Sequence, residues 1–261
     1  MIFAGCDVGS LTVKAVLMDE ERIIASEIIR IAGTADESAR TVMRLALQKA
    51  GLESEAITSC CSTGYGRMAV PFAGINRSEI SCHALGAFWQ NNSIRTLIDI
   101  GGQDCKVIEI DGTGAPRQFA MNDKCAAGTG RCLEILAKTS GIGLENLGPL
   151  SLKAKKSAHI SNKCSIFMEL ELLQHIYVKT DRSIMARGIC EAVAKRVMGL
   201  AATISVKPSI AITGGVSKNS GVVRELELLL GHQFIKLNED PQIAGAIGAA
   251  IFAQKSAEGR L

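Results

Sequence analysis

Apolar residues follow two different periods along the chain. Short apolar runs that end in an Asp or Gly turn predict strands, first at the start of the chain and again in "IDI" (98–100) and "IAIT" (210–213). Longer stretches with apolar residues at helical spacing predict helices, namely 36–50, 130–138, 165–177 and 184–203. Because strands alternate with helices, the predicted class is α/β.

An internal repeat organises this pattern. "DVGSLTVKAVLMD" (7–19) can be laid on "DIGGQDCKVIEID" (99–111) at a spacing of 92 residues. The matched pairs are Asp7 with Asp99, Gly9 with Gly101, Lys14 with Lys106, and Asp19 with Asp111. Each copy predicts a hairpin of two strands around an Asp-x-Gly turn. Two such hairpins predict two similar lobes, 1–92 with 241–261 and 93–240.

The two turns are candidate phosphate sites. Glycine allows backbone N–H groups to converge on an anion, and the nearby Asp carboxylates, Asp7 and Asp99, suit a hydrated Mg²⁺. Two ordinary hairpins are the alternative, because Asp-x-Gly is common. The match at four Gly or polar positions favours phosphate binding.

Two further glycine-containing segments lie near the end of the chain. In "IAITGGVSKNSGVVRELELLL" (210–230) a strand breaks at Gly214 and Gly215 before a helical pattern, which suits a nucleotide at a helix N-terminus but is a weak signal alone. "PQIAGAIGAAIFAQK" (241–255) predicts a helix with small residues at 244–246 and 248–250, a feature of close packing.

Composition narrows the class of protein. The 261 residues are 47% hydrophobic and 21% charged, and no apolar run approaches the roughly 20 residues of a membrane span. The net charge is only +3 without a long Lys or Arg block, so we expect no nucleic-acid partner. "MIFAGCDVGS" (1–10) is typical of a first strand and not of a signal peptide, so a cytoplasmic location is expected.

Nine cysteines occur without a CxxC pair, which argues against a zinc ribbon or a thioredoxin-type site. Most are expected in the core: Cys6, Cys105 and Cys190 lie in apolar patterns, and the adjacent Cys60 and Cys61 would face opposite sides of a strand. Cys125 in "MNDKCAAGTGR" (121–131) and Cys164 in "SNKCSIFMELELL" (161–173) each precede a helical run, where a thiolate is favoured. The residues alone leave buried thiol, nucleophile and metal ligand open for Cys125.

Together, the two hairpins, the Gly214-Gly215 turn and the small-residue helix resemble the superfamily of actin, sugar kinases and chaperone ATPases. This implies a two-lobed actin-like ATPase fold with duplicated ribonuclease-H-like lobes. Within it, one family is resembled nearly end to end: the ATP-dependent activators (archerases) of 2-hydroxyacyl-CoA dehydratases, related to the ATPase subunits of benzoyl-CoA reductase. The motifs that carry this resemblance are "TGYGR" (63–67), "EISCHALGA" (79–87), "IDIGGQDCKVI" (98–108), "MNDKCAAGTGR" (121–131) and "ITGGVSKN" (212–219).

The resemblance implies a homodimer that shares one [4Fe-4S] cluster, with Cys125 and Cys164 as the ligands from each chain. It also implies that ATP hydrolysis drives one low-potential electron from ferredoxin or flavodoxin into an acceptor enzyme. The sequence agrees in one respect, since a cubane needs about four thiolates and no four cysteines here have a ferredoxin-like spacing.

The resemblance also implies roles at the nucleotide site. Mg²⁺ and the attacking water are assigned to Asp7, Asp99, Gln103 and Asp104. The phosphates of ATP or ADP are assigned to Gly9, Ser10, Thr12, Lys14, Gly101 and Gly102. The remaining nucleotide contacts are assigned to Gly128, Thr129, Gly130, Gly214, Gly215 and Asn219.

Several positions depart from the family pattern. Leu11 and Val13 stand where hydroxyl residues are common, and Cys132 stands where Phe is usual. After Cys164 the usual small residue and Ser are replaced by Met168 and Leu170. These changes bear on the phosphate contacts and on the surroundings of the two cysteines.

Three alternatives stay open. The acceptor is either a dehydratase or a benzoyl-CoA-type or double-cubane reductase. A small-molecule kinase of the same fold would need a substrate pocket, for which a first lobe of about 92 residues leaves little room. A nucleotide-gated binding module would bind ATP without iron.

Overall fold

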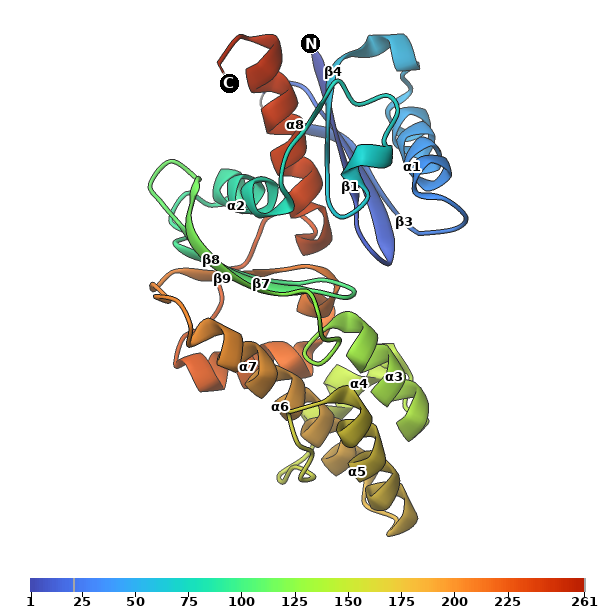
Figure 1. Ribbon diagram of the computed structural model, residues 1–261, viewed down its shortest axis with the longest axis vertical. Coiled ribbons are helices and arrows are strands. Elements are labelled where there is room, and N and C mark those ends of the chain that lie inside the picture. The colour runs from blue at the N-terminus through green and yellow to red at the C-terminus, as the bar shows by residue number, and fades with distance from the viewer. Residues whose placement is uncertain (21, 261) are drawn as a thin grey trace. The chain divides into compact units, whose positions relative to one another are not determined.

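The computed structural model describes residues 1–20 and 22–260 (Figure 1). Its strands and helices form a mixed α/β structure. The strands are β1 (Ile2–Val8), β2 (Thr12–Met18), β3 (Ile23–Arg30), β4 (Ile57–Thr63), β5 (Ile75–Asn76), β6 (Thr96–Ile100), β7 (Cys105–Ile110), β8 (Pro116–Asn122) and β9 (Ile210–Thr213). The α-helices are α1 (Ala35–Ala50), α2 (Glu79–Gln90), α3 (Gly130–Ser140), α4 (Leu144–Ser151), α5 (Ser165–Tyr177), α6 (Arg182–Ala201), α7 (Ser220–Leu230) and α8 (Ala244–Ala257). The short 3₁₀ helices are η1 (Ser54–Ala56), η2 (Arg67–Ala69), η3 (Gly215–Lys218) and η4 (Pro241–Ile243). The predicted α/β class is confirmed.

The chain divides into two units. The first contains residues 1–97, 110–118 and 236–261, and the second contains 98–109 and 119–235. The lobe boundaries expected from the repeat stay a prediction, and each unit is described separately below.

The first unit is built on a five-stranded sheet in the order β3-β2-β1-β4-β5. β1 and β2 pair antiparallel with Asp7 opposite Lys14, and β1 and β4 pair parallel with Asp7 beside Thr63. Alternate residues of β1 face different helices: Ala4 and Cys6 pack in the α1 core, whereas Phe3 packs against α8. Figure 1 shows α1 and α8 on the two sides of these strands. The sheet therefore carries Asp7 on its α8 face.

α8 lies unusually close to its neighbours because glycines remove the intervening side chains. A Cβ on Gly5 of β1 would collide with the carbonyl oxygen of Ala246, and one on Gly86 of α2 would collide with that of Ala244. A Cβ on Gly248 would meet the carbonyl oxygen of Cys82 in the same way. The close packing expected from the small residues of the last helix is confirmed, and it fixes α2 and α8 against the strand that ends near Asp7.

The second unit is organised around α6. Its sheet has the order β8-β7-β6-β9, and the apolar face of β6 and β7 packs in one core with α3, α4, α5, α6 and α7. α6 contacts α4 and α7 closely, while α3 contacts α5. The largest side chains of this core include Ile98, Ile100, Leu133 and Leu136.

The predicted helices at 36–50, 130–138, 165–177 and 184–203 are present as α1, α3, α5 and α6, with ends that differ by at most two residues. Helices α2 and α4 were not predicted. α2 contains Gly86, and α4 contains Gly148 and Pro149, so packing outweighs low helix propensity in both. None of the described helices has the length and apolar character needed to cross a membrane.

Candidate functional site

The first candidate carboxylate, Asp7, is buried at the end of β1. Only 2% of the residue is exposed, and the Lys14 ammonium lies 3.1 Å from its Oδ2. The turn between β1 and β2 is closed by Gly9, whose N–H donates to the Thr12 carbonyl over 3.1 Å. Opposing β1 and β2 thus place one positive and one negative side chain side by side, with a glycine turn next to them.

The second carboxylate, Asp99, occupies the same place at the end of β6 and is also 2% exposed. Lys106 lies 3.3 Å from Asp99 Oδ2 and 2.9 Å from Asp104 Oδ2. The Thr213 hydroxyl donates to Asp99 Oδ1 over 2.9 Å. The turn is closed by Gly101, whose N–H donates to the Asp104 carbonyl over 3.0 Å. The repeat in the sequence is therefore a repeat in hydrogen bonding.

A second correspondence was missed by sequence reasoning. β4 ends at Thr63 and is followed by Gly64, and β9 ends at Thr213 and is followed by Gly214. Both glycines have positive φ, 88° and 82°, which favours glycine. A Cβ on Gly64 would collide with Asp7 Oδ1 and with the Val8 carbonyl, and one on Gly214 would meet Asp99 Oδ1 and the Ile100 carbonyl. Each carboxylate is thus lined by a Thr-Gly strand end, and the shared "TG" in "TGYGR" (63–67) and "ITGG" (212–215) was the available signal.

The remaining residues of the first turn are now placed. Gly9 and Ser10 lie in the turn, Thr12 begins β2, and the Leu11 carbonyl accepts from Ile31 N over 3.0 Å. Val13 is fully buried in the α1 core. The hydrophobic residue at position 13 therefore serves packing on the face opposite Asp7.

In the second unit the predicted nucleotide residues are brought together around the second turn. Gly130 N donates to the Gly101 carbonyl over 2.9 Å, and Arg131 N donates to the Gly102 carbonyl over 2.8 Å. The start of α3 is thereby joined to the 101–102 turn, while Thr129 is fully buried and donates to the Ala126 carbonyl over 2.6 Å. Gly128, with φ of 86°, lies against the Arg196 side chain.

Three other predicted residues have different surroundings. Gln103 is exposed in the second turn. Asn219 is the N-cap of α7, and its side-chain oxygen accepts from Gly221 N and Val222 N, both over 3.1 Å. Gly215 opens η3 directly after Gly214. Asn219 thus has a clear structural role, and its predicted contact with the nucleotide stays a prediction.

Cys125 and Cys164 differ from the other cysteines. Both are partly exposed, whereas the remaining seven are buried. Cys125 lies in the loop before α3, held by Asn122, whose side-chain amide donates to the Cys125 carbonyl over 2.9 Å. Cys164 is the N-cap residue of α5. The pKa of the Cys132 thiol is raised to about 11, mainly by burial and to a smaller extent by the nearby Cys125 and Cys164 thiols. The two exposed thiols therefore both lie in the neighbourhood of Cys132.

The two residues that depart from the family pattern at positions 132 and 168 are in contact. Cys132 Sγ lies 3.8 Å from Met168 Sδ, and neither residue is exposed. The small side chain from α3 and the flexible thioether from α5 fill one part of the core, as methionine does well. Leu170, in contrast, is 51% exposed. The change at 168 is thus accommodated inside the unit, and the change at 170 alters its surface.

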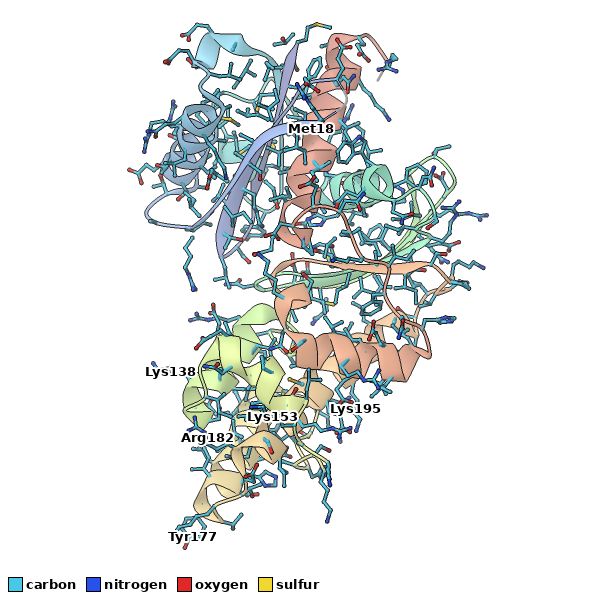
Figure 2. The ribbon with its side chains drawn as sticks, turned by 180° about the vertical axis from the view of Figure 1, so that it is seen from behind. Met18, Lys138, Lys153, Tyr177, Arg182 and Lys195 are labelled. Atoms are coloured by element: carbon cyan, nitrogen blue, oxygen red, sulfur yellow. The ribbon has the colours of Figure 1, made fainter. Side chains whose placement is uncertain are left out.

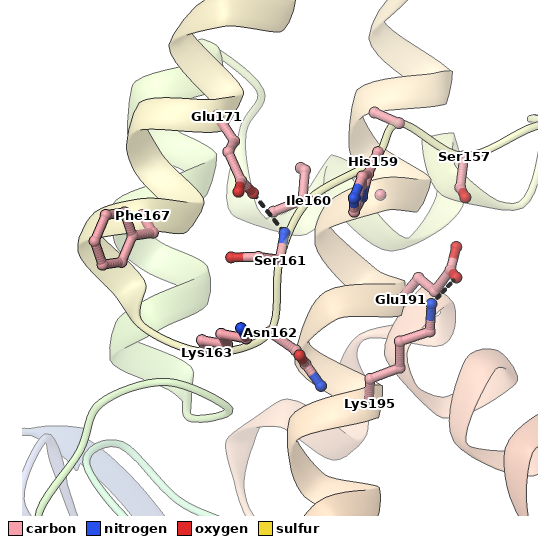
Figure 3. A pocket seen from close by; sticks show the side chains of 12 residues that line it. Ser157, His159, Ile160, Ser161, Asn162, Lys163, Phe167, Glu171, Glu191 and Lys195 are labelled. Carbon is pink, nitrogen blue, oxygen red and sulfur yellow. Dashed lines mark hydrogen bonds and ion pairs between the residues drawn. The ribbon is translucent and has the colours of Figure 1, made fainter.

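The segment that leads to Cys164 borders a pocket of about 690 Å³ (Figure 3). Glu171 of α5 accepts a hydrogen bond from Ser161 N, and Glu191 pairs with Lys195 on α6. The bond between Ser161 and Glu171 attaches the segment before Cys164 to α5, whereas the Glu191–Lys195 pair lies within α6.

α5 presents apolar side chains to solvent. Ile166, Phe167, Leu170, Leu173 and Tyr177 are each about half exposed or more, and Tyr177, labelled in Figure 2, reaches 88%. Contiguous exposed apolar surface is typical of interfaces. The helix that follows Cys164 therefore exposes an apolar surface that is typical of a contact with another molecule.

The Asp7 and Asp99 hairpins each pair a buried carboxylate with a lysine beside a glycine turn. This arrangement suits a divalent cation and phosphate oxygens. Cys125 and Cys164 offer two accessible thiols, which are soft metal ligands. Among the described residues, no three His, Cys, Asp or Glu side chains gather as metal ligands at one point.

Comparisons with known proteins agree with these features. The sequence model of the BadF/BadG/BcrA/BcrD ATPase family matches residues 4–253. The activator of lactoyl-CoA dehydratase from Anaerotignum propionicum is 39% identical over 259 residues, which cover 99% of both chains.

Two solved structures are similar throughout. The activator of 2-hydroxyisocaproyl-CoA dehydratase from Clostridium difficile with bound ADPNP has a TM-score of 0.94 and 39% identity, covering 99% of this chain and 96% of that one. Component A of the Acidaminococcus fermentans (R)-2-hydroxyglutaryl-CoA dehydratase has a TM-score of 0.95 and 36% identity, covering 99% of each chain. The fold expected from the repeat is confirmed by both.

Proposed function

The chain belongs to the BadF/BadG/BcrA/BcrD ATPase family, and from this premise we propose that it hydrolyses ATP to drive a low-potential electron into a 2-hydroxyacyl-CoA dehydratase. The observation that carries the proposal is the 39% identity with a dehydratase activator along the whole of both chains. The two carboxylate–lysine hairpins support its ATPase part. The family resemblance of the motifs is confirmed.

In this proposal Asp7 and Asp99 hold Mg²⁺ and orient the attacking water, with Gln103 and Asp104 nearby in the second hairpin. The glycine turns, with Ser10, Thr12 and Lys14, hold the phosphates. Phosphoryl transfer to water depends mostly on positioning and on neutralising charge, for which buried lysine partners are suited. The bond between Gly130 N and the Gly101 carbonyl supports a nucleotide-sensitive α3, because it joins the second turn to the start of that helix.

The residues present fit two ligands of an iron-sulfur cluster. Cys125 and Cys164 are the two partly exposed cysteines, and both neighbour Cys132. When bound, a [4Fe-4S] cluster supplies one-electron chemistry at low potential.

A homodimer is part of the proposal because two thiols cannot complete a cubane. Cys125 and Cys164 of two copies would provide the four thiolates around a twofold axis. This agrees with the absence of any group of three metal-ligating side chains in the described part of one chain. The exposed apolar residues that follow Cys164 support an interface in this region.

The acceptor and the donor are proposed at the level of class. The acceptor is a dehydratase or a related reductase, and the donor is ferredoxin or flavodoxin. The cytoplasmic location expected from the sequence belongs to the same proposal.

The proposal is tested by the iron content of protein purified without oxygen. We expect about four iron atoms per two chains, and loss of that iron in Cys125→Ala and in Cys164→Ala with ATP binding retained. Cys190→Ala is the matched control, since this buried thiol should leave the iron in place. A full iron complement in the Cys164→Ala protein would contradict the site. An iron-free wild-type protein that phosphorylates a small molecule would favour the kinase.

A further inference from the structure

The proposed function assigns no role to one buried polar group of the first unit, the imidazole of His83 within "EISCHALGA" (79–87). His83 lies on α2 and is only 6% exposed. A methyl group on Gly245 of α8 would lie 2.7 Å from His83 Nε2 and 3.2 Å from Asp7 Oδ2. The imidazole of α2 and the carboxylate of β1 therefore both border the position that a side chain at 245 would take, in the first turn of α8.

The backbone holds this meeting point firmly. Gly86 brings α2 against the Ala244 carbonyl, one residue before Gly245, and Gly248 brings α8 against the Cys82 carbonyl, one residue before His83. Gly5 brings β1, two residues before Asp7, against the Ala246 carbonyl. Three elements are thus clamped by glycine contacts immediately beside the three converging residues, which leaves little freedom for the ring to move away.

A comparison with Asp99 shows which hydrogen bond Asp7 lacks among the described residues. Asp99 Oδ1 receives the Thr213 hydroxyl, whereas the Thr63 hydroxyl, buried beside Asp7, has no hydrogen-bond partner among the described residues. Lys14 holds Asp7 at Oδ2 alone. His83 Nε2 and that same oxygen both lie close to the position of a Cβ on Gly245, and His83 belongs to α2, an element outside the duplicated hairpin. Its position is therefore specific to the Asp7 site.

We propose that His83 is a positioning residue for Asp7, which restricts the carboxylate to the orientation that it uses in ATP hydrolysis. The inference rests on the proposed role of Asp7. Because the ring acts through the carboxylate, its loss should lower kcat for ATP hydrolysis and leave the KM for ATP nearly unchanged. A purely structural role would alter stability without this division.

The experiment compares steady-state ATP hydrolysis by the full chain in three variants. His83→Leu should lower kcat about ten-fold or more, with a KM for ATP within about two-fold of the wild type. His83→Gln keeps a polar N–H donor and should recover most of the loss. Gln90→Leu is the matched control, because Gln90 is a buried polar residue of α2 that bonds Glu239 N over 2.9 Å, at the other end of the helix. It should lower the melting temperature but not kcat.

A double-mutant cycle separates this inference from the proposed function. If His83 acts through Asp7, His83→Leu should change kcat by less than about two-fold in the Asp7→Asn background. An equal loss in both backgrounds, an unchanged kcat in His83→Leu, or equal losses in His83→Leu and Gln90→Leu would overturn the inference while the role of Asp7 stands. Wild-type kcat in Asp7→Asn alone would overturn that role, and the inference with it.

Discussion

The Asp7 and Asp99 hairpins share one backbone plan but differ in how completely the carboxylate is held. Lys106 has 1% of its side chain exposed and bridges Asp99 and Asp104, whereas Lys14 is 12% exposed and, within the described residues, forms an ion pair with Asp7 only. Asp99 also receives the Thr213 hydroxyl, and the equivalent Thr63 hydroxyl is without a hydrogen-bond partner in the described structure.

This difference indicates two degrees of preorganisation. In the second hairpin the charge of the buried Lys106 is already shared by the buried Asp99 and the partly exposed Asp104, so the arrangement is fixed before any ligand arrives. In the first hairpin a buried hydroxyl and a partly exposed lysine still have capacity for further contacts. We therefore expect the Asp99 hairpin to stay rigid when the nucleotide binds and the Asp7 hairpin to adapt to the nucleotide.

The largest expected effect tests what the two hairpins share. Asp7→Asn and Asp99→Asn should each slow ATP hydrolysis by at least about 100-fold, because each removes a carboxylate that is proposed to hold Mg²⁺. Iron content should stay at the wild-type level in both. Asp111→Asn is the control, since Asp111 lies at the far end of the second hairpin and caps a turn through Thr113 N. Wild-type ATP hydrolysis by either the Asp7 or the Asp99 variant would show that the two carboxylates do not have equivalent roles.

The next effect sharpens the difference between the lysines. Lys106→Met should lower the free energy of unfolding by about 3–5 kcal/mol, because it leaves two carboxylates without their buried partner. Lys14→Met should cost about 1–3 kcal/mol, because it removes one charge-assisted contact at a partly exposed site. Urea denaturation followed by circular dichroism measures both. Equal losses would show that the two ion pairs are equally buried in solution.

The smallest effect concerns the two threonines at the strand ends. Thr213→Val should lower the free energy of unfolding by about 1–2 kcal/mol, because Asp99 Oδ1 loses a donor. Thr63→Val should be neutral or stabilising by up to about 1 kcal/mol, because it removes a buried hydroxyl that lacks a partner. The same denaturation measurement compares them. A larger loss in Thr63→Val would mean that this hydroxyl has a partner in solution.

Much of the fold and part of the site followed from local sequence. The spacing of 92 residues predicted both hairpins, and the pairing of Asp7 with Lys14 and of Asp99 with Lys106 follows once two strands meet around a tight turn. Periodicity located α1, α3, α5 and α6 because their apolar residues recur on one face. The exposed state of Cys125 and Cys164, by contrast, could not be predicted, since a cysteine before a helix is as often buried.

What the sequence by itself determined was therefore the set of contacts between residues close along the chain: the turns, the ion pairs across each hairpin and most helices. Only the tertiary structure decided which distant segments complete them. Thr63 lies 56 residues after Asp7, and Thr213 lies 114 residues after Asp99, so no common spacing reveals that both strand ends line a carboxylate. His83 and Asp7 are brought to the same position beside Gly245 only because α2 and α8 pack through glycines against β1. Such long-range contacts are set by the packing of whole elements, which no short pattern in the chain encodes.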